Sequence, residues 1–356
     1  MGVKGKDSQT ALHMMTEGNG ETTVLTREDL PLVSVIVPTF NNGRFIGPAV
    51  ESLLQQTYPE EKREVIIVDD GSTDDTQEVL KKCGQGIIQI RQPHRGIASA
   101  RNAGMSRARG EIITFLDSDD LWLEERLQRV AEKFRENPRA GMVYHPIELI
   151  NSDGATIKKN FYAAFGYEEG VSGWVGNEVA SGKIFSGGSS FAFRRDVVSM
   201  FSPLPDDVRR GVDYYMTVIS SCFAPAEYIP QILGKYRLHS GNVTMAAGMD
   251  DRMTLAAINK DFAHARERVI EKISSLGASL SNTPDLSILR RLQAKERIFF
   301  HVLGGARAGA IKEIPALFKG SPAMRELLRG LAVTFMAFLI PASLYLRIVN
   351  IYRLFK

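Results

Sequence analysis

The chain has 356 residues, of which 44% are hydrophobic and 24% charged, enough for one large or two modest globular domains. Its net charge of +3 is uneven: from Leu286 onward 12 Lys and Arg stand against 3 Asp and Glu, so this tail carries +9 and the rest −6. Cys83 and Cys222 form no paired motif, which argues against a disulfide framework or zinc site and favours a reduced, cytosolic compartment.

Residues 1–31 are polar, rich in Gly and Thr, and lack the apolar core of a signal peptide, so we expect a flexible N-terminal tail. Strands and helices then alternate. Strands are predicted at about 32–39, 64–68, 86–92, 111–117 and 140–150. Each of the first four is followed by a helix, and the fourth helix begins near Leu121. This alternation predicts an α/β fold built on a parallel sheet.

Several polar side chains fall where the predicted strands end, and ligands bind at the carboxyl ends of strands in such sheets. They are Thr39, Asp69, Asp70, Asp117 and Asp119. Asp117 and Asp119 share one face of an extended segment and suit a divalent ion together with a ribose. The alternative interpretation of the run 117–120 is that Ser118 or Asp119 caps the helix that follows, and we expect Asp120 to cap it when the other aspartates bind a ligand.

Beyond residue 150 the sequence becomes Gly-rich and aromatic, as in long functional loops, before a helix at about 213–222 and a strand at about 232–238. From about Met245 the pattern is helical. We therefore divide the chain into the tail, a domain at 32–245 and a helical C-terminal region at 246–356.

The segments "VSVIVPTFNN", "VIIVDDGSTDDT" and "GIASARNAGMSRARGEIITFLDSDD" occur in this order at strand ends. In combination they closely resemble the family 2 glycosyltransferases, from Leu32 to about Thr244. The resemblance implies a GT-A fold, with a Rossmann-like nucleotide-binding sheet. The residues that it assigns to the nucleotide are Pro38, Thr39, one of the Asp69–Asp70 pair, Arg101 and, at the ribose, Asp117.

The resemblance further implies that Asp119 binds Mg²⁺ or Mn²⁺ and that His239, in "YRLH", approaches the metal or the diphosphate. A Glu-Asp pair usually precedes a helix in this family, and its aspartate is the catalytic base. This chain has Val212-Asp213, so Asp213 takes that role, while the missing glutamate leaves the acceptor contacts open.

These residues predict a metal-dependent, inverting glycosyltransferase that uses a nucleotide sugar, with UDP as the expected nucleotide. The acceptor would be a saccharide or a lipid-linked saccharide in surface polysaccharide or glycolipid synthesis, and no nucleic-acid partner is expected. Two alternatives stay open. One is a non-catalytic nucleotide-sugar or glycan-binding protein. The other is a nucleotidyltransferase, for which the loop after the first strand is a poor match because it carries only Arg44.

Leu331 to Leu346 is a run of 16 uncharged residues interrupted by Pro341, shorter than the roughly 20 that a spanning helix needs. Basic and aromatic residues flank it, which favours a helix lying on an anionic membrane surface at the inner face of the cell membrane. The alternatives are a helix docked on the catalytic domain and a contact between two copies of the chain.

Overall fold

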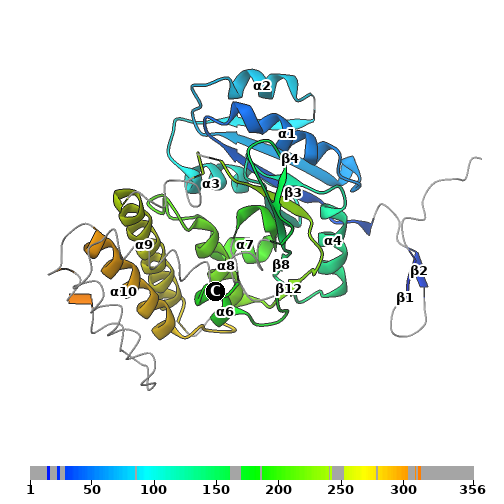
Figure 1. The fold of residues 1–356 in the computed structure, drawn as a ribbon. Coiled ribbons are helices and arrows are strands. Elements are labelled where there is room, and N and C mark those ends of the chain that lie inside the picture. Colours follow the sequence, from blue (N-terminus) through cyan, green and yellow to red (C-terminus); the bar gives the residue numbers. More distant parts are fainter. Residues whose placement is uncertain are drawn as a thin grey trace, which may run out of the picture.

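The computed structural model describes residues 14–16, 22–24, 29–84, 86–160, 170–184, 187–239, 241–242, 252–277, 280–303, 309 and 312–313 (Figure 1). The apolar run at 331–346 lies outside them. Near the N-terminus, β1 (Met14–Thr16) and β2 (Thr22–Val24) pair as an antiparallel ribbon.

A seven-stranded sheet forms the centre of the molecule, in the order β12-β8-β11-β6-β3-β4-β5. Its strands are β3 (Val33–Thr39), β4 (Arg63–Asp69), β5 (Ile87–Arg91), β6 (Ile112–Phe115), β8 (Met142–Tyr144), β11 (Phe191–Arg194) and β12 (Ala226–Tyr228). β3 is buried over all seven residues because it lies between β4 and β6, and its β-branched residues suit a strand covered on both faces.

Side-chain alternation along these strands builds two hydrophobic cores, one on each face. Val35 and Val37 face α1 (Gly43–Leu54), α2 (Thr76–Lys82) and α4 (Arg126–Glu136). Ile36 instead faces α3 (Ile97–Arg107) and the core shared with α6 (Gly176–Ala180), α7 (Arg195–Phe201) and α8 (Val212–Phe223). Figure 1 shows the sheet between these two helical layers.

The predicted α/β architecture is confirmed, but the sheet is mixed. β3, β4, β5 and β6 are parallel, whereas β11 runs antiparallel to both β6 and β8. The single strand predicted at 140–150 is wrong, because His145 and Pro146 separate β8 from β9 (Ile147–Ile150), and the two belong to different sheets.

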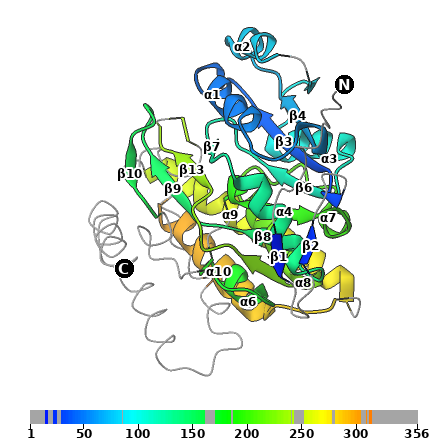
Figure 2. The same ribbon diagram turned by 90° about the vertical axis from the view of Figure 1, so that its right-hand side faces the viewer.

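The second sheet has the order β10-β9-β13-β7 and brings the segment after β6 next to the segment that ends at His239 (Figure 2). It contains β7 (Leu121–Trp122), β10 (Thr156–Lys158) and β13 (Gly234–Arg237). The helix predicted from Leu121 therefore begins only at Arg126, because Leu121 and Trp122 pair with β13 instead.

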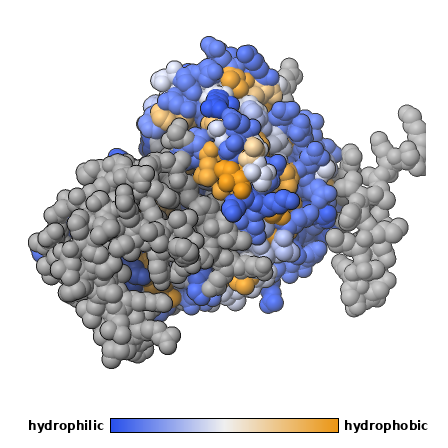
Figure 3. Space-filling view, viewed as in Figure 1, coloured by the Kyte–Doolittle hydropathy of each residue, from blue (hydrophilic) through white to orange (hydrophobic). Residues whose placement is uncertain are grey.

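Two long helices, α9 (Arg252–Leu276) and α10 (Leu286–Leu303), pack on each other, and α9 also packs on α8 and α10 on α6. Their buried residues Ala265, Val269 and Leu289 belong to the same core as α8. Within the described ranges, no helix is both long enough and apolar enough to cross a membrane. The coloured surface in Figure 3 is mostly hydrophilic, with one hydrophobic cluster near the middle of that face.

Candidate active site

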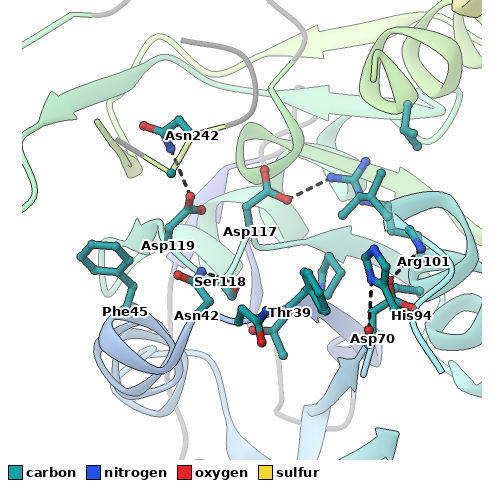
Figure 4. A pocket seen from close by; sticks show the side chains of 18 of the residues that line it. Thr39, Asn42, Phe45, Asp70, His94, Arg101, Asp117, Ser118, Asp119 and Asn242 are labelled. Carbon is teal, nitrogen blue, oxygen red and sulfur yellow. Dashed lines mark hydrogen bonds and ion pairs between the residues drawn. The ribbon is translucent and has the colours of Figure 1, made fainter. Parts of the chain in front are cut away.

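A cavity of about 940 Å³ opens at the carboxyl ends of β3 and β4 (Figure 4). The strand register explains its position, since Thr39 pairs with Asp69 and Asp69 pairs with Arg91, so three strands end at the same level. The predicted site residues on its wall are Pro38, Thr39, Asp70, Arg101, Asp117, Asp119, Asp213 and His239.

Asp69 is the one predicted residue that does not line this cavity. Its carboxylate accepts hydrogen bonds from the Ser72 amide, at 2.9 Å, and from the Gln77 side chain. It thus organises the turn between β4 and α2. Asp70 lies on the cavity wall, where it contacts the His94 ring.

Arg101 holds two carboxylates in the cavity. Its Nη1 lies 2.5 Å from Oδ1 of Asp213 and its Nη2 lies 3.0 Å from Oδ1 of Asp117, while the guanidinium itself is only 1% exposed. Burial lowers the pKa of Arg101, but Asp213 and Asp117 more than offset this, so Arg101 stays charged. Burial and the neighbouring carboxylates of Asp213 and Asp119 raise the pKa of Asp117 to about 6, although the Arg101 guanidinium acts to lower it. Among the described residues, Oδ2 of Asp213 has no partner and is available to a ligand.

Asp119 meets the end of the second sheet. Its Oδ2 lies 2.9 Å from Nε2 of His239 and 3.2 Å from Nδ2 of Asn242. The Asn242 Oδ1 also accepts the His239 amide, at 2.7 Å, and the Phe45 ring packs on the imidazole with centroids 4.6 Å apart. The imidazole and carboxylate are therefore fixed side by side at the rim of the cavity.

The Asp119 carboxylate and the His239 imidazole could together bind a divalent cation that takes its remaining ligands from a substrate. Mg²⁺ is often bound through one or two carboxylates, waters and substrate phosphates. No cluster of three or more His, Cys, Asp or Glu that could hold a metal occurs within the described part of the chain. A metal at Asp119 and His239 would take its remaining ligands from water or from a substrate.

Asp120 does not cap a helix, which corrects the sequence prediction. It is 1% exposed, its Oδ2 accepts the Ser189 hydroxyl at 2.6 Å, and its Oδ1 accepts the Arg237 amide at 2.9 Å. Burial, with Asp119 and Asp117, raises its pKa well above the usual value. Asp120 thus joins the aspartate loop to β13, two residues before His239.

Two glycines allow the backbone to approach the carboxylates closely. A Cβ on Gly188, in the short helix η3 (Gly188–Ser190), would lie 2.5 Å from Nη2 of Arg101 and 2.8 Å from Oδ1 of Asp213. Gly211 has a φ of +79°, and a Cβ there would meet the Cβ of Ala265 in α9 at 3.0 Å. The segment before Asp213 is also tied to α9 by the Arg210–Asp261 ion pair, at 2.5 Å.

Below the aspartate loop lies a fully buried arginine, Arg126, which stacks on Trp122 at 3.6 Å. Its guanidinium donates to Nε2 of His145 at 3.1 Å and to the Phe191 carbonyl at 3.1 Å, and no carboxylate pairs with it among the described residues. Burial lowers the pKa of Arg126, while burial and Arg126 lower the pKa of His145 to about 3. The neutral histidine thus accepts from Arg126, which in turn binds the Phe191 carbonyl two residues after Ser189.

The sequence prediction omitted several residues that build the site, namely His94, Gly188, Arg210 and Asn242. A polar turn after a strand, "HSGN", was the available signal for Asn242. Gly188 and Ser189 stood out only as a Gly-rich turn. Ser189 contacts Asp117 and Asp120, about 70 positions earlier in the chain, and no local pattern encodes such contacts.

The sequence model described as "Glycosyl transferase family 2" matches residues 34–198. An uncharacterised glycosyltransferase of Nostoc sp., alr2836, is 30% identical over 220 residues, which cover 60% of this chain and 67% of that protein. Further curated relatives, such as the putative teichuronic acid biosynthesis glycosyltransferase TuaG of Bacillus subtilis (37% identical, 37% of this chain), are matched over about half or less of their own length.

Two solved structures share the fold. TarS of S. aureus in complex with UDP-GlcNAc has a TM-score of 0.51 at 18% identity, covering 79% of this chain and 89% of that one. The mannosyltransferase PcManGT of Pyrobaculum calidifontis, in complex with GDP-Man and Mn²⁺, has a TM-score of 0.52 at 19% identity, covering 92% and 88%. At these identities the likeness establishes the GT-A fold and nothing about the ligand of this chain.

Proposed function

The chain belongs to glycosyltransferase family 2 and is a transferase, and we propose that it is a metal-dependent, inverting enzyme acting on a nucleotide sugar. The observation that carries this proposal is the arrangement in one cavity of two groups. One is the Asp117–Arg101–Asp213 cluster, and the other is the Asp119–His239 pair. The first suits an acceptor hydroxyl and a sugar, the second a diphosphate.

Asp119 and His239 would hold Mg²⁺ or Mn²⁺ together with the donor diphosphate. Bound there, the ion would neutralise the charge that develops on the departing diphosphate. Asn242 orients both ligands through its hydrogen bonds to Asp119 and to the His239 amide. Asp117 would accept a ribose hydroxyl, while Pro38 and Thr39 would contact the nucleoside; all three line the cavity.

Asp213 acts as the general base. Arg101 occupies only Oδ1, so Oδ2 can accept the proton of an acceptor hydroxyl as its oxygen attacks the anomeric carbon. The bond from that carbon to the diphosphate breaks, and the nucleoside diphosphate leaves from the opposite face. A single displacement inverts the centre, so an α-linked donor gives a β-linked product. Arg101 holds the Asp213 side chain in place through its hydrogen bond to Oδ1.

The expected donor is a UDP-sugar and the expected acceptor a saccharide or lipid-linked saccharide of a surface polysaccharide or glycolipid. The UDP-GlcNAc and GDP-Man complexes of the two structural neighbours support a nucleotide-sugar donor. The B. subtilis relative, named for teichuronic acid biosynthesis, supports the polysaccharide role.

The test is Asp213→Asn. General-base catalysis contributes about 10²- to 10⁴-fold, so transfer should fall by that factor while nucleotide affinity, measured by calorimetry with Mn²⁺, changes less than about twofold. Substantial transfer by the variant would rule out Asp213 as the base. If the unaltered protein binds a nucleotide sugar but neither transfers nor hydrolyses it, the protein is a binding module.

We also propose that the tail at 331–346 attaches the enzyme to the cytosolic face of a membrane. This proposal rests on its apolar run and basic flanks. Flotation of the full chain with anionic and with neutral vesicles tests membrane attachment, and the protein should float with the anionic vesicles. Failure to float with either kind of vesicle would refute membrane attachment and favour docking on the catalytic domain or a contact between two copies.

A further inference from the structure

A buried ion pair joins the two C-terminal helices outside the cavity. Nε of Arg266, in α9, donates to Oε2 of Glu296, in α10, at 2.8 Å, and the two side chains are 10% and 15% exposed. Nη1 of Arg266 has no hydrogen-bond partner in the part of the chain that the structure describes. A buried ion pair often gives no more stability than apolar side chains of similar volume. Stability alone therefore does not account for this pair.

The guanidinium of Arg266 lies over the ring of Tyr214, the residue that follows the proposed base. Its Cζ is 4.4 Å from the centre of the ring, and Tyr214 is 5% exposed. Burial acts to lower the pKa of Arg266, but Tyr214 and Glu296 more than offset this, so Arg266 stays charged. The Tyr214 hydroxyl donates to the Ala180 carbonyl at 2.8 Å. The contacts thus run without a break from α10 through α9 and α8 to α6 (Figure 1 shows α9 between α10 and α8).

Other contacts hold α9 against the segment that leads into α8. Arg210 pairs with Asp261 at 2.5 Å, and a Cβ on Gly211 would meet the Cβ of Ala265 at 3.0 Å. Asp261 and Ala265 are four residues apart and so share one face of α9, and Arg266 directly follows Ala265. Helix α9 therefore contacts the chain both shortly before and immediately after the proposed base.

We propose that the Arg266–Glu296 pair is a positioning pair for Asp213, acting through the first turn of α8. The inference rests on the proposed function, in which Asp213 is the base. A planar guanidinium held by a carboxylate has a fixed direction, so it sets the angle at which Tyr214, and with it α8, packs on α9. Asp213 lies 2.5 Å from Nη1 of Arg101, and misplacement of a catalytic group by about 1 Å costs about 100-fold in rate. Helices α9 and α10 are then part of the catalytic unit.

The main test replaces both charges with apolar side chains. Arg266→Met combined with Glu296→Leu fills a similar volume but removes the planar group over Tyr214. The melting temperature should stay the same or rise, because such a replacement is often neutral or stabilising. Hydrolysis of a panel of UDP- and GDP-sugars with Mn²⁺ measures turnover, which should fall about tenfold or more. The affinity for UDP or GDP with Mn²⁺, measured by calorimetry, should change less than about twofold, since the pair lies outside the cavity.

A second variant separates positioning from stability. Glu296→Gln keeps an oxygen that can accept from Nε of Arg266, but it leaves the buried guanidinium without a counter-charge. The melting temperature should therefore fall. Turnover, measured below that temperature, should stay within about twofold of the unaltered protein because the direction of the guanidinium is kept. Stability and turnover would thus be lost in different variants, which a merely structural role does not explain.

Glu267 and Arg297 provide a matched control. They directly follow Arg266 and Glu296 in the sequence and join the same two helices at 3.2 Å, but their side chains are 44% and 36% exposed. An exposed pair contributes little. Glu267→Gln combined with Arg297→Gln should therefore equal the unaltered protein in turnover and in nucleotide affinity.

Equal turnover in the apolar double variant and the unaltered protein would overturn the positioning role and leave the proposed function intact. So would a turnover that follows the melting temperature from one variant to the next. Crystal structures give a readout that does not depend on activity. In the apolar double variant the distance from Nη1 of Arg101 to Oδ1 of Asp213 should change by about 1 Å, and an unchanged distance would also overturn the inference. If the unaltered protein hydrolyses none of the panel, the proposed function fails and this inference fails with it.

Discussion

The cavity has two halves that are built in different ways. The strand-end half consists of residues that directly follow parallel strands, and the clamped half of residues that reach the cavity through long-range contacts. The strand-end half comprises Thr39, Asp70, Asp117 and Asp119. The clamped half comprises Gly211, Asp213 and His239 on the cavity wall, together with Gly188, Ser189 and Arg237, which lie against residues of that wall. Sheet register fixes the first, whereas hydrogen bonds and close packing between distant segments fix the second.

This difference indicates a division of labour. The strand-end half resembles a rigid nucleotide platform, because each residue is positioned by a buried strand. The clamped half, which carries the proposed base, depends on a few contacts with η3, β13 and α9. Variants in the clamped half should therefore lower turnover more than nucleotide binding, and the following variants test that expectation.

The largest effect is expected for Gly188→Ala. The new methyl group would lie within 3 Å of both Arg101 and Asp213, so the cluster must move, and turnover should fall about 100-fold because misplacement of about 1 Å has that cost. Nucleotide affinity should change little. Gly176→Ala is the control, because the nearest atom to its new methyl group would be 3.4 Å away. If Gly188→Ala and Gly176→Ala have the same turnover, the cluster around Gly188 is not tightly packed.

Asp120→Asn should have the next largest effect, on the metal end. If the asparagine oxygen accepts the Arg237 amide, its N–H group faces the Ser189 hydroxyl, which must then accept instead of donate and loses its own acceptor; this costs about 1–3 kcal/mol. The Mn²⁺ concentration for half-maximal activity should rise about tenfold, whereas nucleotide affinity at saturating Mn²⁺ should stay the same. The exposed Asp206→Asn is the comparison, and an unchanged Mn²⁺ requirement would show that Asp120 does not position His239.

A smaller effect is expected from Asp261→Asn, which weakens the tie between Arg210 and α9. The pair is only partly buried, so turnover should fall about threefold to fivefold, corresponding to roughly 1 kcal/mol or less, at constant nucleotide affinity. Glu271→Gln removes an exposed partner of Arg268 on the same helix and should have no such effect. A decrease in nucleotide affinity instead of turnover would break the proposed division between the halves.

The smallest effect on activity is expected for His145→Gln, beneath both halves. Folding lowers the pKa of His145 to about 3, so below pH 6.5 the unfolded chain gains a proton that the folded chain does not, and stability falls as the pH falls. Between pH 7 and 5.5 this histidine should cost about 1 kcal/mol. In His145→Gln the free energy of unfolding should fall by about 1 kcal/mol less between pH 7 and pH 5.5 than in the unaltered protein. Urea unfolding at the two pH values measures this difference. Parallel pH profiles of the two proteins would contradict a buried neutral imidazole.

Much of the strand-end half could be predicted from the sequence. Buried runs such as "VSVIV" and "VIIV" identify parallel strands, and polar residues at their ends must meet at one edge of the sheet. The prediction was less successful where a residue has two local interpretations. Asp69 and Asp70 are adjacent and alike, and only the approach of the loop at 92–96 distinguishes them.

The sequence by itself determined the α/β architecture, the glycosyltransferase family, and the strand ends that supply Thr39, Asp70, Asp117 and Asp119. The tertiary structure alone decided that Arg101 joins Asp117 to Asp213, 112 residues away, and that His239 meets Asp119, 120 residues away. It also decided that Asp120 binds Ser189 and Arg237 instead of capping a helix. The physical reason is that hydrophobic periodicity reports only on neighbours within an element, whereas a buried carboxylate takes whichever donors the packed chain places within 3 Å.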